Sequence, residues 1–400
     1  MEKYSIWEQR KLGEIAKTLD YGLNASAKDF DGTHKYIRIT DIDDDLHFFD
    51  ESNLTSPDID FSNADNYLLK RGDILFARTG ASVGKTYLHD KDDDIVYFAG
   101  FLIRARFSGS HDTNFVYQNT FTKQYNTFIR VMSQRSGQPG VNAQEYASYS
   151  LGIPLFEEMQ KIGSFFLNLD NIIAANQRKV EKLKRLKAAY LQQMFPRAGE
   201  CVPRIRFKGF SGDWVKRTIG EYGYFYYGKS APKWSVLDNA TTPCVRYGEL
   251  YTKFNEKISR IYSYTNMPSD QLKFSTGREV LVPRVGENPL DFAKCSWLSL
   301  PNIAIGEMIS VYNTEQNPLF VAIYFNALLR KSFAEKVEGG SVSNLYYERL
   351  VDIPVCFPLL AEQEMISNFF ESLNNQILLS CWKLEQLKKL KTAYLQKIFV

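Results

Sequence analysis

The sequence predicts an α+β protein in which two α/β domains are joined by two long antiparallel coiled-coil helices, with a pseudo-twofold internal repeat. The first observation is that LKRLKAAYLQQMF at 183–195 returns as LKKLKTAYLQKIF at 387–399, with nine of thirteen positions identical. The second is that WEQRKLGE at 7–14 is echoed by WVKRTIGE at 214–221. A chain of 400 residues that repeats itself at about half its length is two copies of one unit.

Each copy is expected to hold a globular head followed by a long helix. The predicted ranges are 1–152 for the first head, 153–196 for the central helix, 197–212 for a linker, 213–352 for the second head and 353–400 for the distal helix. An Ile-Pro pair precedes each helix, and Pro196 ends the first one. The heads resemble each other only weakly, which is expected of one scaffold that carries two differently specialised heads.

The helices place mostly apolar residues at alternate steps of four and three, which predicts a coiled-coil seam. The apolar and aromatic seam residues are Ile162, Phe166, Leu169, Ile173, Val180, Leu183, Tyr190, Ile366, Phe370, Leu373, Ile377, Leu384, Leu387 and Tyr394. Asn176 and Ser380 occupy the same polar step, and Lys187 and Lys391 share another. A taut linker reaches at most ~53 Å, whereas the helix measures ~58 Å. This comparison favours an antiparallel pair with one head at each end.

Charge alone does not identify a partner. Residues 1–150 hold 17 Lys and Arg against 22 Asp and Glu, whereas residues 151–212 hold 11 against 5. A negative head taken by itself argues against nucleic acid. For the lysine-rich helix stretches (179–187 and 383–391) a solvated face is the favoured interpretation, and contact with phosphates or with a protein partner is the alternative.

The five cysteines are scattered and contain no CxxC, which predicts reduced thiols in a reducing compartment. No run approaches the ~18 apolar residues of a membrane span. The start of the chain lacks the apolar segment of a signal peptide. We therefore expect a cytoplasmic protein without a membrane partner.

No catalytic constellation is evident. In LFARTGASVGKT at 75–86, Gly80 and Gly84 are separated by three residues, where a phosphate loop needs four. The four histidines show no metal-ligand spacing. The chain is therefore predicted to be non-catalytic and to bind neither a metal nor a cofactor.

The order of motifs resembles the specificity subunits of type I restriction–modification enzymes. The resemblance rests on the Trp-containing start of each copy, on GDILFARTGASVGK at 72–85, on SGQPGVN at 136–142 before an Ile-Pro, and on the repeated helix ending. The joint PRIRFKGFSGDW at 203–214 is similar to the linker between the two halves of those subunits.

The resemblance implies that each head is a target recognition domain reading one half of a bipartite double-stranded DNA sequence. It implies that the paired helices set the unread gap. Two modification subunits, which carry S-adenosylmethionine and methylate adenine N6, are expected partners, as are restriction subunits that act as ATP-dependent translocases and nucleases. The alternative is a non-DNA coiled-coil scaffold with two divergent ligand-binding heads.

Base readout is expected from polar side chains in loops of the heads. The candidate DNA-binding residues are Asn24, Lys28, Arg38, Thr40, Arg78, Thr79, Lys85, Gln138, Asn142, Lys229, Lys233, Arg246, Tyr247, Arg284, Ser341, Ser343 and Asn344. Arg38 recurs as Arg246 and Arg78 as Arg284. These arginines have a structural alternative, namely ion pairs with acids such as Asp73 or Glu249.

Overall fold

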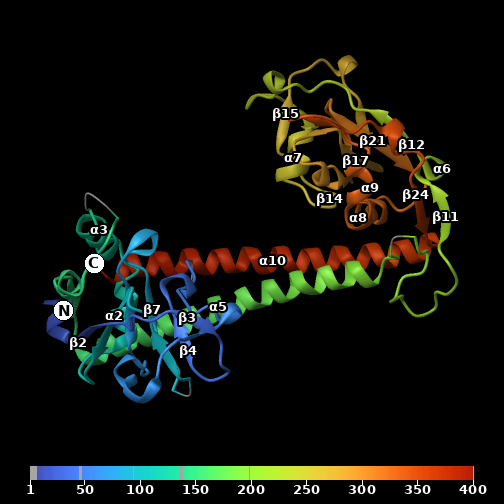
Figure 1. The fold of residues 1–400 in the computed structure, drawn as a ribbon. Helices are drawn as coiled ribbons and strands as arrows, with labels where there is room; N and C mark the ends of the chain where they lie inside the picture. The colour runs from blue at the N-terminus through green and yellow to red at the C-terminus, as the bar shows by residue number, and fades with distance from the viewer. Residues whose placement is uncertain (1–6, 45–46, 93, 135–137, 198, 400) are drawn as a thin grey trace. The chain divides into compact units, whose positions relative to one another are not determined.

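The computed structural model describes residues 7–44, 47–92, 94–134, 138–197 and 199–399 (Figure 1). The ends of two predicted ranges, residues 1–6 and Val400, lie outside the described residues. The chain divides into two compact units, one formed by 1–179 with 380–400 and the other by 180–379. The division passes through both long helices, so each unit holds one head and a part of each helix. The predicted fold class, two α/β heads joined by long helices, is confirmed.

The first head is built on a four-stranded antiparallel sheet of order β2-β9-β6-β7. These strands are Ala16–Tyr21, Leu102–Phe107, Ile74–Ala77 and Thr86–Leu88. Three two-stranded pairs surround it: β1 (Glu8–Lys11) with β10 (Ser150–Ile153), β3 (Ala27–Asp29) with β5 (Thr55–Pro57), and β4 (Lys35–Ile37) parallel to β8 (Val96–Phe98). Its helices are α1 (Leu12–Ile15), α2 (Thr113–Asn119), α3 (Lys123–Met132) and α4 (Ala143–Ala147).

The second head has a five-stranded sheet of order β12-β21-β17-β19-β14. Its strands are Gly223–Tyr227, Ile309–Thr314, Glu279–Pro283, Ser296–Leu298 and Lys257–Ile258. A four-stranded sheet contains β15 (Ser263–Thr265), β13 (Thr242–Val245), β20 (Pro301–Ile305) and β16 (Phe274–Thr276). Smaller sheets pair β11 (Val215–Thr218) with β24 (Pro354–Phe357), and join β18 (Val285–Gly286), β23 (Ser343–Asn344) and β22 (Glu338–Gly339). The helices are α6 (Ile219–Tyr222), α7 (Tyr247–Thr252), α8 (Pro318–Leu328) and α9 (Arg330–Ala334).

The two heads repeat one topology despite their weak sequence similarity. The antiparallel order β2-β9-β6-β7 of the first head recurs as β12-β21-β17-β19 in the second. The pair β1-β10 recurs as β11-β24, and the parallel pair β4-β8 recurs as β13-β20. The internal repeat therefore extends through the heads as well as the helices.

The long helices are α5 (Phe156–Gln193) and α10 (Leu360–Ile398). In the first unit, Phe165 of α5 packs edge-on against Tyr394, and Asp170 pairs with Lys391, so the two helix segments run antiparallel. In the second unit the equivalent contact joins Tyr190 to Phe369.

The seam residues are unequally buried. The buried ones are Phe166, Leu169, Ile173, Val180, Ile366, Phe370 and Leu373. The half-buried ones are Ile162, Leu183, Tyr190, Ile377, Leu384 and Leu387. At the end of α10, Leu395 is buried and the neighbouring Tyr394 is 37% exposed.

An aromatic cluster joins the end of each helix to the head of the other copy. In the first unit, the Phe399 ring lies 5.9 Å from Trp7 and 5.1 Å from Phe115. In the second, Phe195 lies 6.2 Å from Trp214 and 5.8 Å from Phe320. Each head therefore completes its core with the last phenylalanine of the repeated segment from the other copy. This contact gives a physical reason for the strong repeat at 183–195 and 387–399.

The lysine-rich stretches are only partly a solvated face. Lys179, Lys182, Lys184, Lys383 and Lys389 are exposed. The prediction is wrong for Lys187 and Lys391, which are largely buried and form ion pairs with Glu256 and Asp170, each within one unit.

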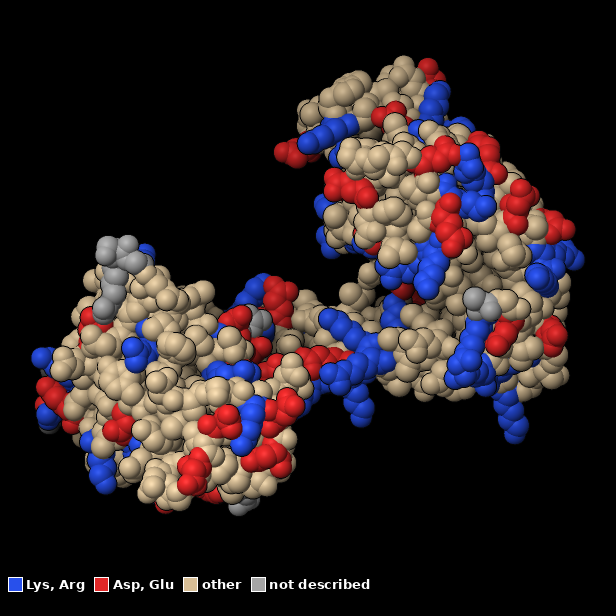
Figure 2. Space-filling model, in the orientation of Figure 1, with Lys and Arg blue, Asp and Glu red and all other residues tan. Residues whose placement is uncertain are grey.

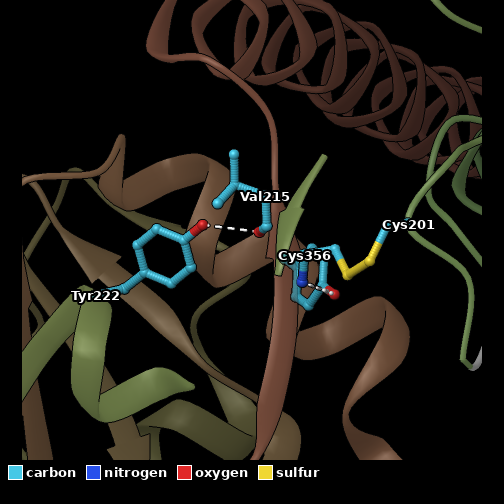
Figure 3. Close-up of a disulfide and its surroundings, with 5 residues drawn as sticks. Cys201, Val215, Tyr222 and Cys356 are labelled. Atoms are coloured by element: carbon cyan, nitrogen blue, oxygen red, sulfur yellow. Dashed lines mark hydrogen bonds between the residues drawn. A yellow bond between two sulfur atoms is a disulfide. The ribbon is translucent and has the colours of Figure 1, made fainter. Parts of the chain in front are cut away.

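The linker belongs to the second unit and contacts α5, α10 and β24. Ile205 N–H donates to the carbonyl of Gln193 at 3.0 Å, and Arg206 forms two hydrogen bonds with the buried carboxylate of Glu362. Cys201 of the linker is bonded to Cys356 of β24, beside the hydrogen bond from Tyr222 to Val215 (Figure 3). The prediction of reduced thiols is therefore wrong for this pair, which is 155 residues apart in the chain.

Throughout the described parts of the chain, no helix has the length and apolar character that crossing a membrane requires.

Candidate nucleic-acid interface

A Tyr-Gly pair ends the first strand of the main sheet in both heads. A Cβ on Gly22 would lie 2.1 Å from the Ala99 carbonyl oxygen, and one on Gly228 would lie 2.2 Å from the Gly306 carbonyl oxygen. Only glycine permits so close a backbone approach. The crossing fixes the position of the next loop in each head, which starts with the exposed residues Asn24 and Lys229.

The ring of the tyrosine supports an arginine that directly follows β6 in the first head and β17 in the second, two strands away in the sheet. The Arg78 guanidinium carbon lies 4.9 Å from the centre of the Tyr21 ring, and that of Arg284 lies 4.7 Å from the centre of the Tyr227 ring. Arg78 also donates to the Gly100 carbonyl at 3.4 Å, and Arg284 lies 2.9 Å from the Met308 sulfur.

Among the residues that the structure describes, no carboxylate forms an ion pair with Arg78 or Arg284. The acid proposed as a structural partner, Asp73, pairs instead with Arg106. Both guanidiniums therefore keep their charge available for an anionic ligand such as a phosphate, or for a base edge.

A second loop approaches the same point in each head. In the first head, Thr79 pairs with Gly140, and the Ala143 N–H donates to the Tyr21 hydroxyl at 3.1 Å. In the second, Val285 pairs with Asn344, and the Leu345 N–H donates to the Arg284 carbonyl at 2.8 Å. The structure therefore gathers a set of the predicted residues around each tyrosine: Asn24, Arg78, Thr79, Gln138 and Asn142 in one head, and Lys229, Arg284, Ser343 and Asn344 in the other.

Some of these side chains are bound to the protein itself. Asn142 caps α4 by accepting the Glu145 N–H at 2.9 Å. Ser343 is 4% exposed, and its hydroxyl donates to the Gly340 carbonyl. Lys229 donates to the Asp270 carbonyl at 2.8 Å but remains exposed.

The remaining predicted residues form their contacts with other parts of the heads and not with the Tyr–Arg pairs. The guanidinium of Arg38 forms two hydrogen bonds with Asp41, at 2.8 and 2.9 Å, and the Arg38 backbone N–H donates a third. The Thr40 hydroxyl also contacts Asp41. Lys85 is largely buried, donating to the Ile42 carbonyl and pairing with Asp44.

Lys28 of β3 forms an exposed ion pair with Asp58 at 3.6 Å. In the second head the backbone N–H of Arg246 donates to Glu249, Tyr247 is partly buried, and Lys233 and Ser341 are exposed.

Two further residues belong to the same surfaces and were not predicted from the sequence. They are Tyr21 and Tyr227, whose rings support the arginines. The recurrence of the Tyr-Gly pair was the available signal, but the aromatic role needed the arginine position. Trp234, beside Lys233, is 74% exposed, which is unusual for so large an apolar side chain.

Figure 2 shows acidic and basic side chains interspersed over the visible face of each unit. The charge pattern on this face therefore does not mark a binding surface, in agreement with the low net charge. Among the described residues, no group of three or more His, Cys, Asp and Glu side chains is arranged to hold a metal ion.

The loop that carries Arg38 and Thr40 leads to His47, whose backbone is left-handed at φ 56°. The ring lies 4.7 Å from that of Phe121. Burial lowers the pKa of His47 to about 4, and the positive charges of Lys391 and Lys85 act in the same direction.

We expect the unfolding free energy of the wild type to fall by about 2–3 kcal/mol relative to His47→Asn as the pH drops from 6.5 to about 4. A histidine whose pKa is lowered on folding binds its proton more readily when unfolded, so this contribution is lost as the pH falls. Asparagine does not titrate and tolerates the left-handed backbone. Urea titrations of both proteins at several pH values test this, and parallel pH profiles would contradict the assignment.

A family model described as the type I restriction modification DNA specificity domain matches residues 4–185. The MjaX type I restriction enzyme specificity subunit of Methanocaldococcus jannaschii is 22% identical over 399 residues, covering 96% of this chain and 91% of that protein.

Solved structures share the fold. The type I restriction–modification S subunit from M. genitalium has a TM-score of 0.65 at 13% identity, covering all of this chain and 98% of that one. A chain in a structure of a type I R-M system has a TM-score of 0.51 at 16% identity, covering 98% and 97%. By the family model over residues 4–185, the relative matched along most of its length and the shared two-headed fold, the chain is similar to the specificity subunits of type I restriction–modification systems.

Proposed function

We propose that each head reads one half of a bipartite DNA target and that the chain directs adenine-N6 methylation or restriction by partner subunits. The observation that carries this proposal is the Tyr–Arg pair at the same place in both heads, surrounded by loops that differ between them. A cation present in both heads suits the phosphates that every DNA half-site contains, whereas side chains that differ between the heads suit different base sequences.

The partners in this proposal are two modification subunits and the restriction subunits. S-adenosylmethionine would be bound by the modification subunits, and this chain would contribute no catalytic group and no cofactor site. A chain that acts on cellular DNA in this way would work in the cytoplasm.

A gel shift with the co-expressed modification subunit separates this proposal from the non-DNA scaffold. We expect the complex to shift a labelled duplex, and we expect some unlabelled duplexes to compete for binding far better than others of equal length. A complex that assembles and binds every duplex equally, or none, would favour the scaffold.

Replacing Arg78 by alanine should cost about 1–3 kcal/mol at the half-site read by the first head. The guanidinium has no ion pair within the described chain, so its loss should be felt in DNA binding more than in folding. Arg284→Ala is the matched control and should weaken only the other half-site. Binding is measured with duplexes that carry either half alone, and unchanged methylation of both half-sites in Arg78→Ala would remove the residue from the interface.

A further inference from the structure

The two long helices each place a lysine at a step of the seam where an apolar residue is expected. The side chain of Lys391 is 15% exposed and that of Lys187 is 22% exposed. Burying a charge is costly unless it is paired and hydrogen-bonded. A largely buried lysine therefore occurs at the same seam step in both helices, 204 residues apart.

In the first unit, Lys391 links three elements. Its ammonium lies 2.7 Å from Asp170 of α5 and 4.1 Å from the centre of the Phe121 ring of the head. The other carboxylate oxygen of Asp170 accepts a hydrogen bond of 2.6 Å from Gln118 of α2, which is buried. Helix α10, helix α5 and the first head thus meet at one charged contact.

In the second unit, Lys187 makes the equivalent link with exchanged partners. It lies 2.6 Å from Glu256 of the head, whose other oxygen accepts a hydrogen bond of 3.2 Å from Asn374 of α10. Asn374 is the counterpart of Asp170 in the repeat. In the first unit the helix supplies the carboxylate (Asp170) and the head supplies the amide (Gln118). In the second unit the head supplies the carboxylate (Glu256) and the helix supplies the amide (Asn374).

The exchange indicates what the contact is for. If only a particular ion pair mattered, its two partners would stand at the same positions in both copies. What both copies keep is a lysine of one helix tied, through a carboxylate and an amide, to the other helix and to a head. Apolar packing such as that of Phe399 and Phe195 holds a head on the helices but tolerates small rotations, whereas a buried ionic contact has a narrow geometry.

We infer that Lys391 and Lys187 are positioning residues that fix the angle of each head on its helix segments and so restrict the complex to one gap length. This inference rests on the proposed function in DNA recognition. It adds that the gap depends on these two contacts as well as on the length of the helices.

The test uses the full chain assembled with its modification subunits. Methylation is measured on duplexes whose gap is the natural length, one base pair shorter or one base pair longer. The preference is the ratio of methylation on the natural gap to methylation on the altered gaps. We expect Asp170→Asn and Gln118→Glu, each alone, to lower this ratio by about tenfold or more. The double variant Asp170→Asn/Gln118→Glu places the carboxylate on the head and the amide on the helix, as in the second unit, although Glu256 lies before β14 and not in the counterpart of α2. It should recover the preference.

A triple variant, Lys391→Met/Asp170→Leu/Gln118→Leu (the Met/Leu variant), guards against loss of folding. It also replaces the buried amide of Gln118, which would otherwise lose its hydrogen bond to Asp170. Replacing all members of a buried ionic group by apolar residues of similar size often leaves stability unchanged. We expect this variant to melt like the wild type and to accept altered gaps. Lys389→Met is the surface control, because Lys389 pairs with Glu385 in an exposed contact of the same helix.

The inference is overturned if the Met/Leu variant keeps the wild-type melting temperature and the wild-type gap preference. It is also overturned if the Asn/Glu double variant discriminates no better than its single variants. A wild-type complex that methylates none of the duplexes would instead count against the proposed function itself.

Discussion

Insertion of four residues beside Asn176 of α5 should lengthen the unread gap by about two base pairs and leave both half-sequences unchanged. Four residues add ~6 Å of rise and nearly one helical turn, close to two base pairs of ~3.4 Å each. Four residues also correspond to about half a heptad, so the seam continues as a stutter. The recognised motif is read by sequencing methylated DNA from cells that carry the variant.

The register of the seam supplies the control for this experiment. Two inserted residues would turn Val180 and Leu183 off the seam and should abolish assembly. Because α10 also connects the two units, at Leu379–Ser380, a variant with four residues added beside Ser380 as well should lengthen the gap at least as much. If the four-residue variants methylate only the original spacing, the helices do not set the gap.

Exchange of residues 1–150 for the head of another family member should change one half of the recognised sequence and leave the other half intact. Each head has its own sheet, its own core and its own Tyr–Arg pair, so its reading surface does not depend on the other head. The motif methylated in cells reports the outcome directly.

The structure specifies what the exchanged head must keep. Counterparts of Trp7 and Phe115 are needed to pack around Phe399, and a counterpart of Gln118 is needed beside Asp170. A matched exchange of the second head should alter the other half of the motif. A single exchange that alters both halves would contradict separate reading.

The helices and the repeat were predictable from the sequence because their signals are local and periodic. Phe166 and Phe370 follow the heptad, and both are buried. Close to the end of α10 the pattern is less reliable, since a straight helix drifts from a 3.5-residue period. There Leu395 is buried and Tyr394 is partly exposed.

The contacts between distant segments were not predictable from the sequence. Nothing in the spacing of Cys201 and Cys356 indicates that the linker and β24 place their sulfurs together. Lys187 and Lys391 resemble their exposed neighbours in sequence, and only the approach of a head and a second helix buries them. At the candidate interface, the recurrence of Arg78 as Arg284 was visible, but the tyrosine ring that supports each arginine depends on the pairing of β2 with β9 and of β12 with β21.

The most direct test of the central claim is methylome sequencing of cells with and without this chain, in the presence of its modification subunits. DNA recognition by two heads predicts an adenine-methylated motif in two parts, separated by a gap of fixed length, that disappears when the chain is deleted. A methylome that is the same in both cell lines would contradict the account.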